Sequence, residues 1–171
     1  KDIRERLSKR GAIPRYSIAI KFNPLKRKST FTHYTYSVGQ DGRITPMAHF
    51  KPVEFFGAIH DKTTAHSLKR FNELALRPGD KVDLTLVNDV IVYIRKSKDK
   101  FNEANTAPLE EFPETCPCCG EPLYVTDSGD SAVCINFYCR EKVIGRLTNF
   151  LKKLNSKDFS SESIRTLDVT W

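Results

Sequence analysis

The sequence contains no apolar stretch long enough to cross a membrane. Its longest uninterrupted apolar run is Val-Ile-Val-Tyr-Ile at residues 90–94, whereas a spanning helix needs ~18 residues. No apolar segment follows the first residues, so a secretory signal is not indicated, and we expect an intracellular protein in which disulfide bonds are disfavoured. The chain also lacks an initiator methionine, and we therefore expect a piece of a longer polypeptide.

The basic residues are concentrated at one end of the chain. The 171 residues carry a net charge of +7, and 39% of them are hydrophobic, which is ordinary for one or two globular domains. Residues 1–30 hold ten Lys or Arg and two acids, a net charge of +8, while the remainder is close to neutral. This excess is typical of a segment that binds a polyanion, although a solvated, partly disordered arm is an equally good interpretation.

All five cysteines lie between positions 116 and 139. Cys116, Cys119, Cys134 and Cys139 form the pattern C-x2-C, fourteen residues, C-x4-C, which places four thiolates around a tetrahedral Zn²⁺. Four sulfur ligands leave no position for a reacting water, so we expect a structural site. Cys118 is left over. The alternatives are two disulfides with one free thiol, or unrelated buried thiols.

The segment before the cysteines predicts strands at residues 16–22 and 30–39. A strand can resume at residues 43–45, where Pro46 implies an edge or a bulge, and another extended stretch follows through Phe50, Val53 and Phe55. Residues 64–75 change to a helical period with Thr64 as a possible cap, and residues 82–86 and 90–94 predict a hairpin. This composition favours a mainly β fold, a five-stranded OB-fold barrel, with a small sandwich or an SH3-like barrel as alternatives.

The remaining segments are a polar, proline-containing linker at residues 99–115 and an amphipathic helix at residues 141–154. The apolar face of that helix includes Val143, Leu147 and Phe150. We place Lys142 on its polar face together with other basic residues, namely Arg146, Lys152 and Lys153.

Several short fragments occur in a fixed order along the chain: residues 14–22, Val38-Gly39 with Gly42, and residues 44–46, 52–54, 64–66, 79–82 and 89–91. Cys-Pro-Cys-Cys-Gly-Glu-Pro-Leu at residues 116–123 completes the set. Each fragment is modest, but as an ordered set they resemble the middle of a bacterial-type NAD-dependent DNA ligase. The resemblance implies five parts: the end of the nucleotidyltransferase (adenylation) domain at 1–24, the OB-fold domain at 25–98, a linker at 99–115, a four-cysteine zinc finger at 116–140, and a helix leading toward a helix-hairpin-helix region at 141–171.

The resemblance also implies the reaction and its partners. In the family an enzyme lysine takes AMP from NAD, AMP passes to the 5′-phosphate of nicked double-stranded DNA, and the 3′-hydroxyl displaces AMP. Mg²⁺ assists in the complete enzyme, and the remaining ligase domains are expected in cis or as a partner subunit. Lys21 matches the lysine that contacts the AMP phosphate, which makes it the catalytic and cofactor-binding candidate. Spacing alone makes an ordinary exposed lysine the more common outcome.

Two departures from the family pattern stand out. The nucleophilic lysine of the family lies in a Lys-x-Asp-Gly motif, which does not occur in these 171 residues, so we expect the chain alone to be inactive. The family arginine after Val-Gly is replaced by Gln40, and Arg43 is a possible substitute.

Two other classes of function remain open at the level of sequence. One is a non-catalytic nucleic-acid-binding protein with an OB barrel and a zinc ribbon, and the other is a structural adaptor whose zinc knuckle docks another chain. For nucleic-acid binding the candidate contacts are basic residues, each more often merely solvated: Arg15, Arg43, Lys51, Arg95, Lys152 and Lys153.

Overall fold

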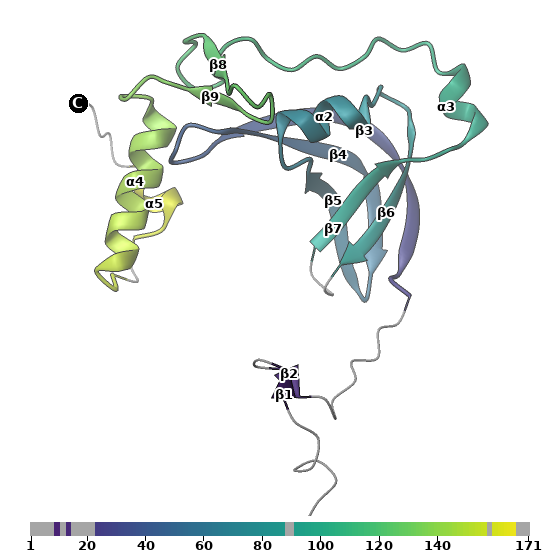
Figure 1. Cartoon of the computed structure of the whole chain (residues 1–171), viewed down its shortest axis with the longest axis horizontal. Coiled ribbons are helices and arrows are strands. Elements are labelled where there is room, and N and C mark those ends of the chain that lie inside the picture. Colours follow the sequence, from purple (N-terminus) through teal and green to yellow (C-terminus); the bar gives the residue numbers. More distant parts are fainter. Residues whose placement is uncertain (1–8, 11–12, 15–22, 88–90, 157–158, 167–171) are drawn as a thin grey trace, which may run out of the picture.

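A curled five-stranded antiparallel sheet forms the main body of the protein (Figure 1). The computed structural model describes residues 9–10, 13–14, 23–87, 91–156 and 159–166. Sheet order is β5-β4-β3-β6-β7, built from strands β3 (Lys26–Val38), β4 (Ile44–Phe55), β5 (Ala58–Thr64), β6 (Lys81–Val87) and β7 (Ile91–Lys96). A separate pair of two-residue strands, β1 (Lys9–Arg10) and β2 (Ile13–Pro14), precedes them. The predicted mainly β, OB-like fold is confirmed.

The long strand β3 holds the sheet together because it pairs with two partners. Its first residues, Lys26 to Thr30, pair with β6, and the rest pairs with β4, with a register shift between Phe31 and His33. The sheet curls until β5 at one edge lies against β7 at the other. There the hydroxyl of Thr63 donates a hydrogen bond to the carbonyl oxygen of Val92, which joins the two edges of the barrel.

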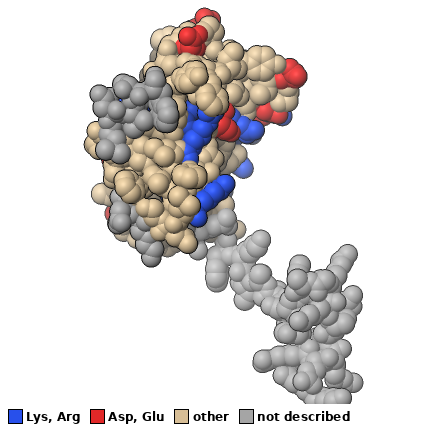
Figure 2. Space-filling view, turned by 90° about the vertical axis from the view of Figure 1, so that its left-hand side faces the viewer, with Lys and Arg blue, Asp and Glu red and all other residues tan. Residues whose placement is uncertain are grey.

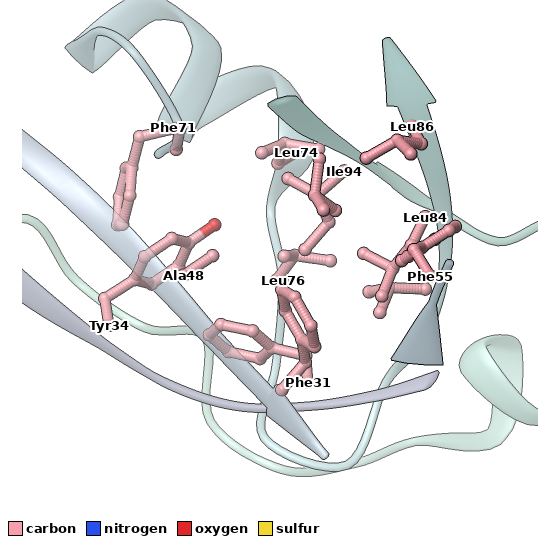
Figure 3. Packing of buried hydrophobic residues seen from close by; sticks show 14 residues of the cluster. Phe31, Tyr34, Ala48, Phe55, Phe71, Leu74, Leu76, Leu84, Leu86 and Ile94 are labelled. Carbon is pink, nitrogen blue, oxygen red and sulfur yellow. The ribbon is translucent and has the colours of Figure 1, made fainter. Parts of the chain in front are cut away.

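The barrel interior is filled by aromatic and branched side chains (Figure 3). Along β4 the buried positions alternate, so that Ile44, Ala48 and Phe50 face inward while the residues between them are more exposed. Phe31, Phe55 and Leu84 are almost completely buried. Each such side chain contributes about 1.5–3 kcal/mol through removal from water, which makes this cluster the main source of barrel stability.

The helix between β5 and β6 begins later than the sequence indicates. Helix α2 spans Leu68–Leu74, and its cap is Ser67, whose side chain accepts a hydrogen bond from the N–H of Arg70 at 3.2 Å. Thr64 is not the cap, because it ends β5 and its hydroxyl instead accepts from the N–H of His66 at 2.9 Å. The buried face, Leu68, Phe71 and Leu74, closes one end of the barrel.

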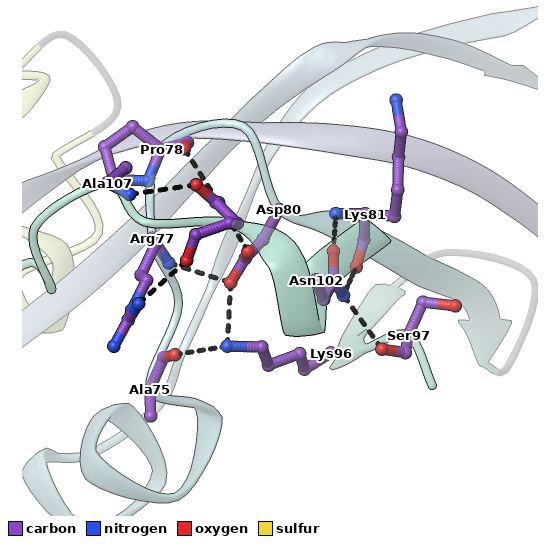
Figure 4. Close-up of polar contacts among 10 residues, drawn as sticks. Ala75, Arg77, Pro78, Asp80, Lys81, Lys96, Ser97, Asn102 and Ala107 are labelled. Atoms are coloured by element: carbon purple, nitrogen blue, oxygen red, sulfur yellow. Dashed lines mark hydrogen bonds and ion pairs between the residues drawn. The ribbon is translucent and has the colours of Figure 1, made fainter. Parts of the chain in front are cut away.

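The buried carboxylate of Asp80 connects the segment that follows the barrel to the barrel itself (Figure 4). Asp80 is fully buried and accepts from the Nζ of Lys96 at 2.8 Å, the N–H of Arg77 at 3.0 Å and the Nδ2 of Asn105 at 2.7 Å. Burial alone would raise the pKa of Asp80, but the hydrogen bonds from Lys96, Arg77 and Asn105 outweigh it and hold the pKa below its ordinary value. The predicted linker therefore includes ordered structure, namely helix α3 (Lys100–Ala104) and the segment up to Asn105.

The last part of the described chain is a small module beside the barrel. It contains the hairpin of β8 (Leu123–Val125) and β9 (Ala132–Cys134), followed by helices α4 (Arg140–Lys153) and α5 (Ser161–Thr166). The amphipathic helix predicted at residues 141–154 corresponds to α4. Among the described residues, none of the helices is long and apolar enough to span a membrane.

Candidate metal centre and nucleic-acid interface

Four cysteines from three short segments converge in the module. Cys116 and Cys119 lie in the turn before β8, Cys134 ends β9, and Cys139 immediately precedes α4. Their Sγ atoms all lie within 4.8 Å of one another. The Sγ atoms of Cys116 and Cys139 are 3.9 Å apart, and those of Cys119 and Cys134 are 3.6 Å apart. A tetrahedron with metal–sulfur bonds of 2.3 Å has edges of about 3.8 Å, so the observed spacing fits a four-thiolate zinc centre.

The same distances argue against the disulfide alternative. A disulfide bond requires two sulfur atoms at about 2.05 Å, and all five cysteines are free thiols in the structure. Cys118, the fifth thiol, is exposed and is not one of the four clustered sulfurs, whereas Cys116, Cys134 and Cys139 are buried. The structure therefore brings together the four residues that the spacing selects and leaves the fifth outside.

The thiols are unlike ordinary solvent-exposed cysteines. Burial raises the pKa of Cys134 to about 11 and raises that of Cys139 further. For Cys119, burial acts in the same direction, but hydrogen bonds led by the N–H of Glu121 overcome it and lower the pKa to about 7. A buried cluster of this kind favours protonated thiols unless a cation replaces the protons, which is the chemistry expected of a metal-binding site.

The metal centre is built against the barrel and shares a small core with it. The buried cysteines pack with Ile44, the first residue of β4, and with Tyr36, Val38 and Phe112 around it. Gly42, in the turn between β3 and β4, accepts a hydrogen bond at 2.9 Å from the N–H of Cys134. Arg43 forms a β-bridge with Val133 in β9. The tip of the β3–β4 hairpin is thus part of the metal module.

Lys142 has a different environment from the one expected. We placed it on the polar face of the helix, but it is 5% exposed and its Nζ donates at 2.9 Å to the carbonyl oxygen of Cys134. The prediction failed because helical periodicity describes one apolar stripe and cannot anticipate a carbonyl oxygen arriving from another element. No pattern in the sequence indicates this contact.

The predicted apolar stripe of α4 is only partly buried: Ile144 is buried, Val143 and Leu147 are intermediate, and Phe150 is exposed. Val143, Leu147 and Phe150 line a concave site of about 330 Å³ together with Phe137, Tyr138 and Arg146. The guanidinium of Arg146 lies over the ring of Phe137, 4.3 Å from its centroid. The module therefore presents aromatic surface next to a cation.

The candidate DNA contacts are distributed over several elements. Arg15 and Lys21 lie outside the described residues. Arg43 is in the β3–β4 turn, with its side chain 66% exposed and its Nε 3.2 Å from the carboxylate of Asp41. Three further candidates are exposed: Lys51 lies in β4, and the neighbouring Lys152 and Lys153 lie in the last turn of α4. Figure 2 looks from the side on which α4 lies in Figure 1, and on that face the basic side chains form a strip in a mostly uncharged surface.

The sequence did not single out two other groups of side chains. One is a pair of stacked histidines, His33 and His49, whose ring centroids are 4.5 Å apart. The other is a set of basic residues on the outer face of β3 and β7, of which only Arg95 was a candidate. Lys26 and Lys28 alternate along a strand, so strand periodicity could have placed them on one face.

One comparison with known proteins concerns the residues that form the barrel. Residues 28–106 match the family model described as the NAD-dependent DNA ligase OB-fold domain. The match covers nearly all of the barrel strands and helix α3.

Curated relatives extend the similarity beyond the residues that match the OB-fold domain. A DNA ligase from Sulfurihydrogenibium sp. (strain YO3AOP1) is 34% identical over 155 residues, covering 89% of this chain and 22% of the relative. DNA ligases from Brachyspira hyodysenteriae and Orientia tsutsugamushi (strain Boryong) are each 31% identical, covering 87% and 96% of this chain and 22% and 24% of their own lengths. The chain thus spans roughly a fifth to a quarter of the curated relatives it matches.

Proposed function

We propose that this chain is the OB-fold and four-cysteine part of an NAD-dependent DNA ligase that seals nicks in duplex DNA. The observation that carries the proposal is the match of residues 28–106 to the ligase OB-fold domain, continued in ligase relatives through the four cysteines. We also propose the domain boundaries expected from the sequence, with the adenylation domain ending near residue 24 and the zinc finger at 116–140. The remaining domains would lie in the same polypeptide, since the relatives are several times longer than this chain.

The proposed reaction divides between this chain and the rest of the enzyme. A lysine outside these 171 residues would attack the α-phosphorus of NAD and expel nicotinamide mononucleotide, because the Lys-x-Asp-Gly motif is absent here. AMP would pass to the 5′-phosphate, and attack by the 3′-hydroxyl would release it and close the strand. NAD supplies the adenylyl group, and Mg²⁺ would offset charge on the phosphates.

Within the chain, Lys21 is proposed to contact the AMP phosphate. A compact ammonium group can offset the negative charge that develops on phosphorus during transfer, which is often a large term in catalysis. Cys116, Cys119, Cys134 and Cys139 are proposed as the ligands of a structural Zn²⁺, because their donor set and spacing fit that ion and leave no open position.

The test uses the complete ligase with Lys21→Ala and, as a matched control, Lys62→Ala at an exposed lysine of β5. We expect Lys21→Ala to reduce AMP transfer and nick sealing by at least about 100-fold, on the scale of lost transition-state charge stabilisation. Zinc content and affinity for nicked DNA should stay unchanged, and the control should remain fully active. Normal sealing by Lys21→Ala would contradict the assigned role, and a complete protein without nick-sealing activity would contradict the proposed function.

A further inference from the structure

The outer face of the β3–β6–β7 half of the barrel carries the basic side chains of Lys26, Lys28 and Arg95, and Arg27, between the two lysines on β3, lines the same concave site. We call these four residues the basic barrel surface. Lys26 and Lys28 are exposed and alternate along β3, and Arg95 is exposed on β7. These residues line a concave site of about 410 Å³ together with Asp83 and Thr85 of the strand between them. The site is therefore made by three neighbouring strands.

The strand register arranges these side chains in a row across the sheet. Lys28 is paired with Asp83 in β6, and Asp83 is paired with Arg95 in β7. Because adjacent strands lie about 4.8 Å apart, Lys28 and Arg95 start roughly 10 Å from each other, and Lys26 lies about 6.6 Å along β3 from Lys28. The cations are thus spread over a length that suits an extended ligand better than a single small anion.

The positive charge of this surface is largely uncompensated. Among the residues that the structure describes, Asp83 is the one carboxylate lining the concave site, against four cations. None of the ion pairs formed among residues 23–87, 91–156 and 159–166 involves Lys26, Arg27, Lys28 or Arg95. The surface therefore presents about three positive charges in solution.

The cationic surface continues along β7 past an aromatic ring. The guanidinium of Arg95 lies 5.5 Å from the ring centroid of Tyr93, and that of Arg70 lies 5.1 Å from the same centroid. Cation–π contact of this kind restrains an exposed arginine without neutralising it. Arg70 is partly compensated by Glu73, at 3.1 Å, so Arg95 is the stronger anchor.

We propose that the basic barrel surface binds the sugar–phosphate backbone of duplex DNA flanking the nick, at a site separate from the candidates Arg43, Lys152 and Lys153. This inference rests on the proposed function. Lysine and arginine on an exposed strand face supply charge but no groove-reading element, so the contact positions the DNA without reading its sequence. The several phosphates of a backbone match cations that are spread over three strands, and their counterions are released on binding.

The experiment measures the binding of a labelled nicked duplex to the 171-residue chain at several salt concentrations. The charge-reversal variant is Lys28→Glu/Arg95→Glu. The matched control is Lys62→Glu/Lys100→Glu, which makes the same change of net charge at exposed lysines of β5 and α3. A third variant, Lys28→Arg/Arg95→Lys, keeps the charge and should bind like the unchanged chain.

We expect the reversal variant to bind about tenfold or more weakly, and its log–log salt slope to become shallower by about 2, since each phosphate contact contributes roughly 0.9. The control should keep the original slope. An equal loss in the reversal variant and the control would show that only net charge matters and would overturn the site. A poly-glutamate competitor that displaces the duplex at equal charge concentration would favour an acidic protein partner and also overturn it.

Failure of the inference and failure of the proposed function give different results. If the unchanged chain binds the nicked duplex and the reversal variant binds it equally well, the basic barrel surface is not a DNA site while the ligase assignment stands. If the unchanged chain does not bind the nicked duplex even at low salt, both are contradicted.

Discussion

The carbonyl oxygen of Gly42 and the N–H of Cys134 are joined by a 2.9 Å hydrogen bond, which connects the barrel to the candidate metal centre. Gly42 has a φ of +87°, and a Cβ placed on it would collide with the carbonyl oxygen of Cys134. A second close approach lies nearby, since a Cβ on Gly145 of α4 would be 2.8 Å from that of Gln40. The turn between β3 and β4 therefore fits against the module closely enough to exclude a methyl group.

From this fit we expect Gly42→Ala to lower the free energy of unfolding by about 2–4 kcal/mol, combining left-handed backbone strain with overpacking. Gly129→Ala is the matched control, because Gly129 also has a positive φ, +68°, but nothing lies within 4 Å of its Cβ position. The control should cost only about 1 kcal/mol. Denaturant unfolding of both variants measures the difference, and equal losses would show that the turn does not pack tightly on the module.

Much of this fold follows from local patterns. The strand patterns of residues 30–39, 82–86 and 90–94 predicted β3, β6 and β7, and the cysteine spacing identified the four thiols that converge. Residues 43–45 and the stretch through Phe55 were expected to be extended on either side of an edge or bulge at Pro46, and they form one strand, β4. These features are visible because strand period, helix period and ligand spacing are properties of short segments.

The features that were missed depend on distant contacts. Strand β5 reads Ala-Ile-His-Asp-Lys-Thr-Thr, and as an edge strand it buries little besides Thr63, so no apolar alternation marks it. The cap at Ser67 rather than Thr64 follows from where β5 stops pairing with β4, at Met47 and Thr64. The burial of Lys142 follows from the position of the Cys134 carbonyl oxygen. None of these is set by neighbouring sequence.

Loss of the proposed Zn²⁺ should destabilise the adjoining part of the barrel. We expect Cys134→Ser to lose bound zinc and to increase hydrogen exchange at residues 39–45, because Ile44 packs with the cysteines and Gly42 is bonded to Cys134. Cys118→Ser is the control and should retain both metal and protection, since Cys118 is exposed and outside the cluster. Metal analysis and exchange mass spectrometry test this. A Cys134→Ser protein with unchanged exchange at residues 39–45 would show that the hairpin is ordered independently.

The buried carboxylate of Asp80 should make the barrel acid-sensitive. Its folded pKa is lowered by Lys96, Arg77 and Asn105, so its contribution to stability is fully present above the ordinary carboxyl pKa of about 4 and is lost as the pH falls through the folded value. Asp80→Asn should cost about 2 kcal/mol at neutral pH and flatten the stability profile below pH ~4. Unfolding curves from pH 7 to pH 2 measure both effects, with the exposed Glu54→Gln as control. An unchanged profile in Asp80→Asn would contradict the account.

His49, which stacks on His33, should also lose its contribution to stability on acidification, but at a higher pH than Asp80. The pKa of His49 is lowered, first by burial and then by the nearby His33 and Lys62, while Asp61 acts in the opposite direction. The Nε2 atom of His49 lies 2.8 Å from the hydroxyl of Thr35. As the pH falls, His49 is therefore protonated at a higher pH in the unfolded chain than in the folded protein. The contribution of His49 to stability is present above pH ~6.5 and declines as the pH falls below it. An NMR titration should place His49 below 6.5, and His33→Ala should move it upward by removing one of the causes. A His49 pKa at or above 6.5 in the unchanged chain would contradict the lowered pKa. The control is Thr32→Ala, which removes only the 3.1 Å hydrogen bond between Thr32 and His33 and should leave the titration of His49 nearly unchanged.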